Sequence, residues 1–181
     1  MKKIWDYFIP SDKHGNWGKF IIDSTGYFSC VTDYGNYAFQ WTAHGDDDFR
    51  EFLVSLNTDY LLGKLSSGKT VFDERGTRQI IKERIVSMRK DGKYGLDATE
   101  ARYLYDKVDD CSTEHDFEEF FREAKDPDGD DFFRDWWEMF SQCYDYDLQG
   151  FAERLWPRFV EALKAELLVT ERVCKEPRVI S

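Results

Sequence analysis

The sequence predicts an α+β fold, in which an N-terminal antiparallel three-stranded β-meander packed by a helix is followed by a helical lobe of about four helices. Three short runs of β-branched and aromatic residues lie between Gly18 and Trp41, separated by turn residues. Such short connections permit only antiparallel pairing. After Asp46 the apolar residues recur with helical spacing. We expect residues 1–65 to contain the meander and its helix, and residues 66–181 the helical lobe, together in one compact unit.

The strands of the meander are expected at residues 19–23, 27–32 and 37–41. A sheet of this size leaves one face open, which a helix must cover. The segment after the third strand supplies this helix, because Phe49 and Leu53 fall on one helical face and acidic residues precede them at the N-terminal turn. A break is expected near Asn57, and Tyr60 to Leu65 continue as helix.

The helical segments of the lobe are expected at residues 77–90, 97–108, 113–124, 131–143 and 149–168. Asp91-Gly92 closes the first of them, and Asp97 to Glu100 forms a capping-box pattern that opens the second. In the last segment Trp156-Pro157 predicts a kink or a new helix start, because proline lacks the backbone donor of a helix interior.

Composition places the chain among folded proteins of a reducing compartment. Its 41% hydrophobic and 17% aromatic residues are sufficient for a core. The N-terminus lacks the apolar stretch of a signal peptide, and no run approaches the roughly 20 apolar residues of a membrane span. The four cysteines are widely spaced and contain no CxxC pair, which argues against a disulfide framework and a zinc site. We therefore expect a cytoplasmic protein with no membrane partner.

Charge is segregated along the chain. Residues 109–147 contain fifteen carboxylates and three basic residues, so the net charge of this segment is −12. The formal net charge of the whole chain is −11, so the remaining residues together carry a net charge of +1. Residues 75–93 show the opposite bias, with seven basic residues and two acidic ones. The acidic segment is also rich in aromatic residues, and from 113 to 124 Phe117, Phe120 and Phe121 share one helical face while carboxylates occupy the other.

The acidic segment supplies the candidate binding surface. The predicted partner-binding residues are Glu114, Glu118, Glu119, Glu123, Asp126, Asp128, Asp130 and Asp131. A row of carboxylates can compete with the phosphates of nucleic acid for the cleft of a nucleic-acid-binding protein. The alternative is a solvated face that the basic stretch of the same molecule partly neutralises. Direct binding of nucleic acid is disfavoured by like charge.

Gly63 to Thr70 satisfies the phosphate-binding pattern G-x-x-x-x-G-K-[ST] letter for letter. In such a site backbone amides surround the phosphates, Lys69 contacts the terminal phosphates and Thr70 binds magnesium. However, the pattern requires a buried strand before it and a long helix after it. Here a helix end precedes it, and Gly76 is expected to interrupt any helix after it. We favour an interhelical loop, and retain nucleotide binding by Gly68, Lys69 and Thr70 as the alternative.

Other candidate chemistry does not fit its pattern. Asp126 to Asp131 is similar to the start of a calcium loop, but Asp131 stands where glycine is needed and Trp137 where a bidentate glutamate is needed. A dyad of Cys30 and His44 has no supporting context. We therefore expect no catalytic residues, no metal and no cofactor, and a protein that is not an enzyme.

Two stretches, TDYGNYAFQWTAHGDDDFREFLVSLNTDYLLGKL and FAERLWPRFVEALKAEL, resemble small bacteriophage and prophage accessory proteins over most of residues 17–168. The resemblance implies a setting in the cytoplasm of an infected bacterium. Such proteins include host-takeover factors and anti-CRISPR inhibitors, some of which mimic DNA. The expected function is therefore a non-enzymatic, acidic phage protein that binds and inhibits a host protein, with a nucleic-acid-binding defence effector as the expected partner class. A structural phage component remains a further alternative.

Overall fold

The computed structural model describes residues 2–45, 48–92, 95–125, 129 and 131–175, with side chains described as far as residue 170. The chain divides into two compact units. Unit 1 comprises Met1–Lys69 and Tyr144–Ser181, and unit 2 comprises Thr70–Cys143. The first unit therefore joins the N-terminal part of the chain to its C-terminal helix.

Unit 1 is built on an antiparallel sheet with the strand order β1-β2-β3-β4. The strands are β1 (Ile4–Ile9), β2 (Gly18–Asp23), β3 (Tyr27–Thr32) and β4 (Gly35–Gln40). The last three match the predicted meander, but the prediction of a three-stranded sheet is wrong because β1 pairs with β2 along its whole length. In β1, Ile4 and Phe8 are exposed while Ile9 is buried, so both faces carry apolar residues. The alternation of apolar and polar residues that identifies a half-buried strand in a sequence is therefore missing.

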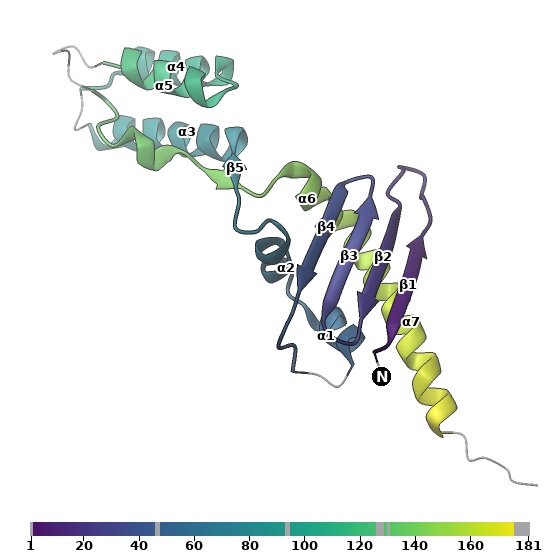
Figure 1. Cartoon of the computed structure of the whole chain (residues 1–181). Helices are drawn as coiled ribbons and strands as arrows, with labels where there is room; N and C mark the ends of the chain where they lie inside the picture. The colour runs from purple at the N-terminus through teal and green to yellow at the C-terminus, as the bar shows by residue number, and fades with distance from the viewer. Residues whose placement is uncertain (1, 46–47, 93–94, 126–128, 130, 176–181) are drawn as a thin grey trace, which may run out of the picture. The chain divides into compact units, whose positions relative to one another are not determined.

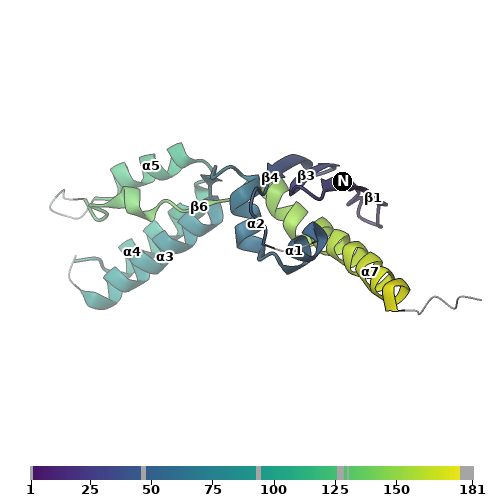
Figure 2. The same ribbon diagram turned by 60° about the horizontal axis from the view of Figure 1, so that its bottom comes forward.

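Helices cover one face of the sheet (Figures 1 and 2). They are α1 (Phe49–Ser55), α2 (Thr58–Leu65), α6 (Tyr146–Gly150), a π-helical turn (Phe151–Leu155) and α7 (Trp156–Lys175). The predicted break near Asn57 is confirmed, because the Asn57 side chain accepts hydrogen bonds from the first amides of α2. The predicted change at Trp156-Pro157 takes the form of the π-helical turn, which ends where the proline has no amide hydrogen to donate.

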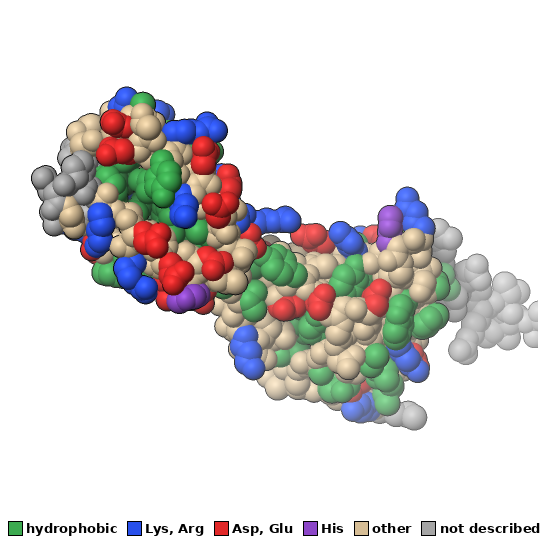
Figure 3. Space-filling model, turned by 90° about the horizontal axis from the view of Figure 1, so that it is seen from above, with side chains coloured by type: hydrophobic (Ala, Val, Ile, Leu, Met, Phe, Trp, Pro, Cys, Tyr) green, Lys and Arg blue, Asp and Glu red, His purple; other side chains and the backbone are tan. Residues whose placement is uncertain are grey.

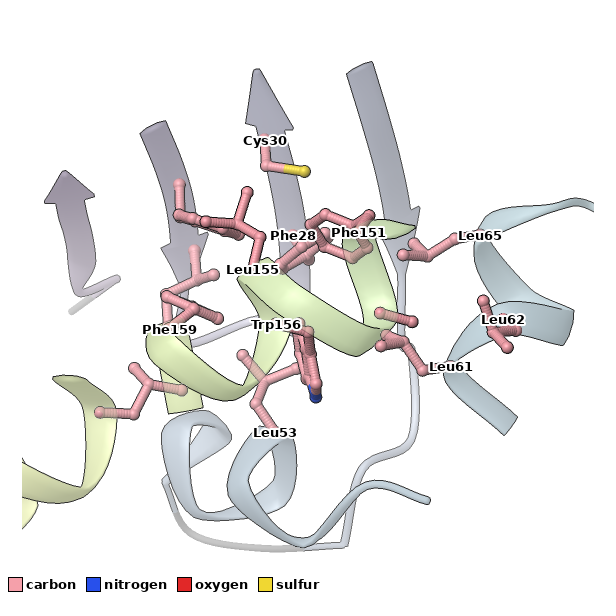
Figure 4. Packing of buried hydrophobic residues seen from close by; sticks show 14 of the residues in the cluster. Phe28, Cys30, Leu53, Leu61, Leu62, Leu65, Phe151, Leu155, Trp156 and Phe159 are labelled. Atoms are coloured by element: carbon pink, nitrogen blue, oxygen red, sulfur yellow. The ribbon is translucent and has the colours of Figure 1, made fainter. Parts of the chain in front are cut away.

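The core of unit 1 consists of aromatic and aliphatic side chains between the sheet and these helices (Figure 4). Phe20 from β2 stacks on Phe159 from α7, with ring centroids 4.1 Å apart and an interplanar angle of 5°. Phe28 from β3 contacts Trp156 edge to face. Each such side chain contributes about 1.5–3 kcal/mol when it is fully removed from water. The C-terminal helix is therefore an integral part of this core.

A polar network around the buried Arg50 also ties α1 to α7 in unit 1. Arg50 is 5% exposed and its guanidinium pairs with Asp48 and, at 3.0 Å, with Glu166. Glu166 also accepts a hydrogen bond from the Tyr7 hydroxyl, which brings β1 into the network. Burial and the neighbouring Glu166 carboxylate raise the pKa of Tyr7, so its hydroxyl remains a donor at neutral pH. The arrangement satisfies the buried arginine that would otherwise destabilise the fold.

In unit 2, two of the predicted helices form a helical hairpin. It is formed by α3 (Glu74–Asp91) and α4 (Ala98–Lys107), followed by a 3₁₀ turn (Val108–Asp110) and α5 (Glu114–Glu123). Gly92 adopts a left-handed conformation at the end of α3, and Asp97 and Glu100 form the predicted capping box of α4. A short sheet pairs β5 (Val71–Phe72) with β6 (Gln142–Cys143).

Two further predictions of the fold are wrong. When α6, the π-turn and α7 are counted as one continuous helix, the described residues form six helices and not about four. The segment 131–143 is not an α-helix: it contains a 3₁₀ turn (Trp136–Met139) and then β6. Contacts far apart in sequence hold it, since the Ser141 amide donates to Thr77 Oγ1 and the Ser141 carbonyl accepts from Asp73. These contacts replace the hydrogen bonds that a helix would make.

Candidate functional site

Helix α5 carries the candidate binding surface of unit 2, and its start is fixed by a capping box. Thr113 Oγ1 accepts a hydrogen bond from the Asp116 amide, while Asp116 Oδ2 accepts from the amides of Ser112 and Thr113 at 2.9 and 2.8 Å. These backbone hydrogen bonds lower the pKa of Asp116 to about 2. One carboxylate of the acidic segment is therefore committed to the start of the helix.

The inner face of α5 is aromatic, as the sequence predicts. Phe117, Phe120 and Phe121 are at most 4% exposed and belong to the core of unit 2. Phe121 contacts Phe133 edge to face, with ring centroids 5.3 Å apart. This packing fixes the rotation of the helix about its axis and so determines which residues face the solvent.

The outer face of α5 presents Glu114, Glu119 and Glu123 to solvent, with Glu118 partly exposed between them. The imidazole of His115 lies 3.8 Å from the Glu118 carboxylate and 3.5 Å from that of Glu119. In Figure 3, which views unit 2 from the side of α4 and α5, acidic side chains gather around a hydrophobic patch with basic side chains among them. The face is therefore acidic but not uniformly so.

A hollow of about 300 Å³ lies beside the second half of α5, lined by Glu118, Phe121, Arg122, Lys125, Asp131 and Trp136. The Lys125 ammonium and the Asp131 carboxylate form an ion pair across it. Next to Trp136, the side chain of Trp137 is 57% exposed, and the two indole rings contact edge to face at 6.0 Å. The helix that the sequence predicts over residues 131–143 would place both tryptophans on an aromatic stripe that faces the core, so the exposed Trp137 is a site residue that the sequence does not reveal.

The structure brings together only part of the predicted partner-binding set. The four glutamates Glu114, Glu118, Glu119 and Glu123 share one face of α5, and Asp131 lines the adjacent hollow. Asp126, Asp128 and Asp130 lie outside the described residues. The binding role of the whole set stays a prediction.

The basic helix α3 meets the acidic segment at Asp109. Lys82 Nζ lies 2.6 Å from Asp109 Oδ1 and Arg78 Nε lies 3.7 Å from it, while Arg78 also pairs with Glu74 of its own helix. The Lys82 ammonium lowers the pKa of Asp109. These contacts are at the 3₁₀ turn before α5, whereas the outer glutamates of α5 remain exposed to solvent.

The phosphate-binding pattern from Gly63 to Thr70 does not form a phosphate cradle. Gly63 to Leu65 complete helix α2, and β5 follows with only two residues. The amides of Ser66, Ser67, Gly68 and Lys69 donate to Leu62 O, Lys64 O, Ser66 Oγ and Ser66 O respectively. Backbone donors already used within the chain are not available for a phosphate. Gly76, expected to interrupt the following helix, instead lies within α3.

The cysteine and histidine residues show no arrangement for nucleophilic or metal chemistry in the parts described. Burial raises the pKa of the Cys30 thiol to about 12, so it is not a thiolate at neutral pH. His44 packs against Phe49 with ring centroids 5.1 Å apart. Among the described residues, no group of three or more His, Cys, Asp or Glu side chains is arranged to hold a metal ion.

Comparison with known proteins identifies the family of this chain. The chain is a phage-associated protein. It belongs to the phage family Phage_phiTE_072, whose model matches residues 1–165. No curated protein and no solved structure matches the chain. Over the described residues, every helix is too short or too polar to cross a membrane.

Proposed function

We propose that this phage protein binds a host protein through the acidic face of α5 and inhibits it by occupying a nucleic-acid-binding surface, as those anti-CRISPR proteins that mimic DNA do. The observation that carries the proposal is the exposed row of glutamates on a helix whose inner face is locked into the core of unit 2. This acidic ridge, formed by Glu114, Glu118, Glu119 and Glu123, is rigid and presents its charges without a large ordering cost on binding. Membership of a phage family supports a host protein as the target.

The geometry combines two features of a binding surface. Carboxylates steer a basic partner over distances up to a Debye length, which is about 8 Å at physiological ionic strength. The exposed Trp137 supplies a large, rigid apolar side chain of the kind that dominates interface energetics. The ridge therefore raises the rate of association with a basic partner, and the indole of Trp137 contributes binding energy when the partner buries it. No covalent bond is made or broken in this proposed activity, so the proposal describes a binding protein and not an enzyme.

The experiment is affinity capture from a lysate of the host bacterium, at low and high salt, with the bound proteins identified by mass spectrometry. We expect a nucleic-acid-binding protein to be retained at low salt and released at high salt. The double variant Glu119→Lys and Glu123→Lys reverses two exposed charges of the ridge and should lose this protein. The matched control reverses Glu153 and Glu161, which are exposed on the C-terminal helix of unit 1, and should retain it.

The proposal fails if the ridge variant and the control capture the same proteins with the same salt dependence. It also fails if the proteins lost by the ridge variant do not bind nucleic acid. Circular dichroism of both variants distinguishes lost binding from lost folding. Lysine is a good helix former and is favourable near a helix C-terminus, so Glu123→Lys should not destabilise α5.

A structural phage component is a second candidate, favoured by the uncovered face of the sheet in unit 1. Phe8 and Val31 are 64% and 51% exposed on this face, and Ile4 is 66% exposed. Asp6 and Lys19 lie between these side chains on the same face, but several exposed apolar side chains on one face are still a feature of protein interfaces. Light scattering after size-exclusion chromatography tests this candidate: it requires homo-oligomers that Phe8→Lys converts to monomers, whereas a monomer at all concentrations removes it.

A further inference from the structure

A groove runs between α3 and α4 of unit 2, on a surface that the proposed function does not use. Two hollows of about 550 and 340 Å³ share Val86 and Tyr105 in their linings and together form this groove. The larger one lies towards the N-terminal half of α3, and the smaller one continues towards Arg89 and Lys90. Both helices contribute side chains to its walls.

The floor of the groove is apolar. Ile85 is buried and Ala101 is 9% exposed, so they form its base, while Val86 is 42% exposed and projects into it. Tyr105 is partly exposed, and Lys82 Nζ lies 4.4 Å from the centre of its ring. This cation–π contact holds the ring against the wall of the groove. A ligand that fills the groove would therefore bury apolar side chains as well as meet charge.

The rim of the groove is cationic. Six basic side chains line it against the single carboxylate Glu83, namely Arg75, Arg78, Lys82, Arg89, Lys90 and Arg102. Three of the six are already paired, since Arg78 contacts Glu74, Lys82 contacts Asp109 and Arg102 contacts Asp106. Arg75, Arg89 and Lys90 are exposed and have no ion-pair partner among the residues that the structure describes.

The cations and the exposed valine follow one stripe of α3. At 100° per residue, Arg75, Val86 and Arg89 lie within an arc of about 80° that also contains Arg78 and Lys82. At 1.5 Å per residue, Arg75 and Arg89 are about 21 Å apart along the helix axis. This length matches about four turns of a second helix laid alongside.

We propose that the groove between α3 and α4 binds an acidic amphipathic helix of a partner protein. The apolar side chains of that helix would contact Val86 and Tyr105, and its carboxylates would pair with Arg75 and Arg89 at either end. Helix-in-groove recognition of this kind relies on apolar anchors at helical spacing with complementary charge at the edges. A nucleic-acid backbone offers phosphates but no apolar side chains for the floor, so the mixed lining favours a peptide.

The test uses the full chain and a fluorescein-labelled helical peptide of about 18 residues, long enough to form helix in water. This peptide carries leucines at i, i+3, i+4 and i+7 with glutamates on its other face. A peptide with lysine in place of glutamate and a labelled single-stranded DNA are the comparison probes. Fluorescence anisotropy gives the Kd of each probe at low and moderate salt.

We expect the glutamate peptide to bind at low salt and the lysine peptide to bind at least about tenfold more weakly. The double variant Arg75→Glu and Arg89→Glu should raise the Kd of the glutamate peptide by at least about tenfold, and Val86→Asn by about threefold or more. The charge-matched control Arg154→Glu and Lys164→Glu, in the C-terminal helix of unit 1, should leave it unchanged.

Three results would overturn the proposal. The first is absence of binding by the glutamate peptide, and the second is equal loss of binding in the groove variant and in the control. The third is tighter binding of DNA than of the peptide through Arg75 and Arg89, which would make the groove a nucleic-acid site. Val86→Asn keeps the test independent of charge, because it removes an apolar contact and leaves every cation in place.

Discussion

Lys82 of α3 and Asp109 form an ion pair at 2.6 Å, and this pair is where the basic helix meets the acidic segment. It lies before the start of α5, so it does not cover the outer glutamates of that helix, which are exposed. Charge matching within the molecule therefore accounts for Asp109, the first carboxylate of the acidic segment, and leaves the ridge accessible. This relationship separates the part of the acidic charge that stabilises the fold from the part that we propose binds a partner.

The aromatic core beneath the ridge should be essential for the stability of unit 2. Phe121 is 2% exposed and contacts several other rings. Phe121→Ala should lower the free energy of unfolding by about 3–5 kcal/mol, as measured by urea denaturation followed by circular dichroism. Trp137→Ala is the control, because that side chain is largely exposed, and it should cost less than about 1 kcal/mol. Equal costs for the two variants would contradict the assignment of Phe121 to the core and Trp137 to the surface.

The turn between β2 and β3 requires glycine at position 26. Gly26 has a φ of 87°, and a Cβ there would lie 2.0 Å from the carbonyl oxygen of Trp41. Gly45 has a φ of 77° but nothing within 4 Å of a Cβ. Gly45→Ala should therefore cost about 1–2 kcal/mol for the backbone conformation alone, and Gly26→Ala at least about 1 kcal/mol more because the Trp41 carbonyl must shift. Thermal unfolding of both variants measures the difference, and a smaller effect at Gly26 would contradict this geometry.

Asp23 should make the stability of unit 1 depend on acid pH. Burial alone would raise its pKa, but the ion pair with Lys2 and the hydrogen bonds from Thr25 outweigh burial and lower it from 3.8 to about 2. Since the folded pKa is the lower one, the stabilisation is present above about pH 4 and is lost as the pH falls towards 2. Asp23→Asn should thus lower the free energy of unfolding by about 2 kcal/mol at pH 7 and by much less at pH 2.

Urea denaturation of the wild type and Asp23→Asn at a series of pH values measures this dependence. Glu153→Gln, which removes an exposed carboxylate of the same unit, is the control and should change stability little at any pH. A deficit of Asp23→Asn that stays constant from pH 7 to pH 2 would show that the carboxylate is not the source of the effect.

The phosphate-binding pattern should be inactive. Its amides donate within the chain, so titration of magnesium-ATP into the protein should give no saturable heat, for the wild type and for Lys69→Ala alike. A saturable heat in the wild type that disappears in Lys69→Ala would restore nucleotide binding as the function.

The sequence predicts those elements whose signals are local. Asn57, Gly92 and Asp97 each end or begin a helix through contacts within a few residues, and the structure places a helix boundary at all three. The outward position of the glutamates on α5 follows from periodicity in the same way. Strand β1 could not be predicted, since Ile4 and Phe8 are exposed apolar residues that hide its alternation.

Contacts between distant residues decide the rest. Segment 131–143 has helical spacing of its aromatic residues, but Ser141 is bonded to Thr77 and Asp73, which no local pattern indicates. The sequence does not predict the exposure of Trp137 for the same reason, because an α-helix over this segment would place this side chain with the core aromatics. The groove between α3 and α4 likewise depends on the packing of the two helices. The sequence shows its basic residues, but it does not show that apolar side chains of the two helices meet to form its floor.

The central claim is that the acidic ridge of α5 occupies a nucleic-acid-binding surface of a host protein. The most direct measurement is displacement of a fluorescent nucleic acid from the captured host protein by increasing amounts of this chain, followed by anisotropy. We predict that the wild type and the Glu153→Lys and Glu161→Lys control displace the nucleic acid equally well. The Glu119→Lys and Glu123→Lys variant should require at least about tenfold higher concentrations. Simultaneous binding of the nucleic acid and this chain to the host protein, or equal displacement by all three forms, would contradict the claim.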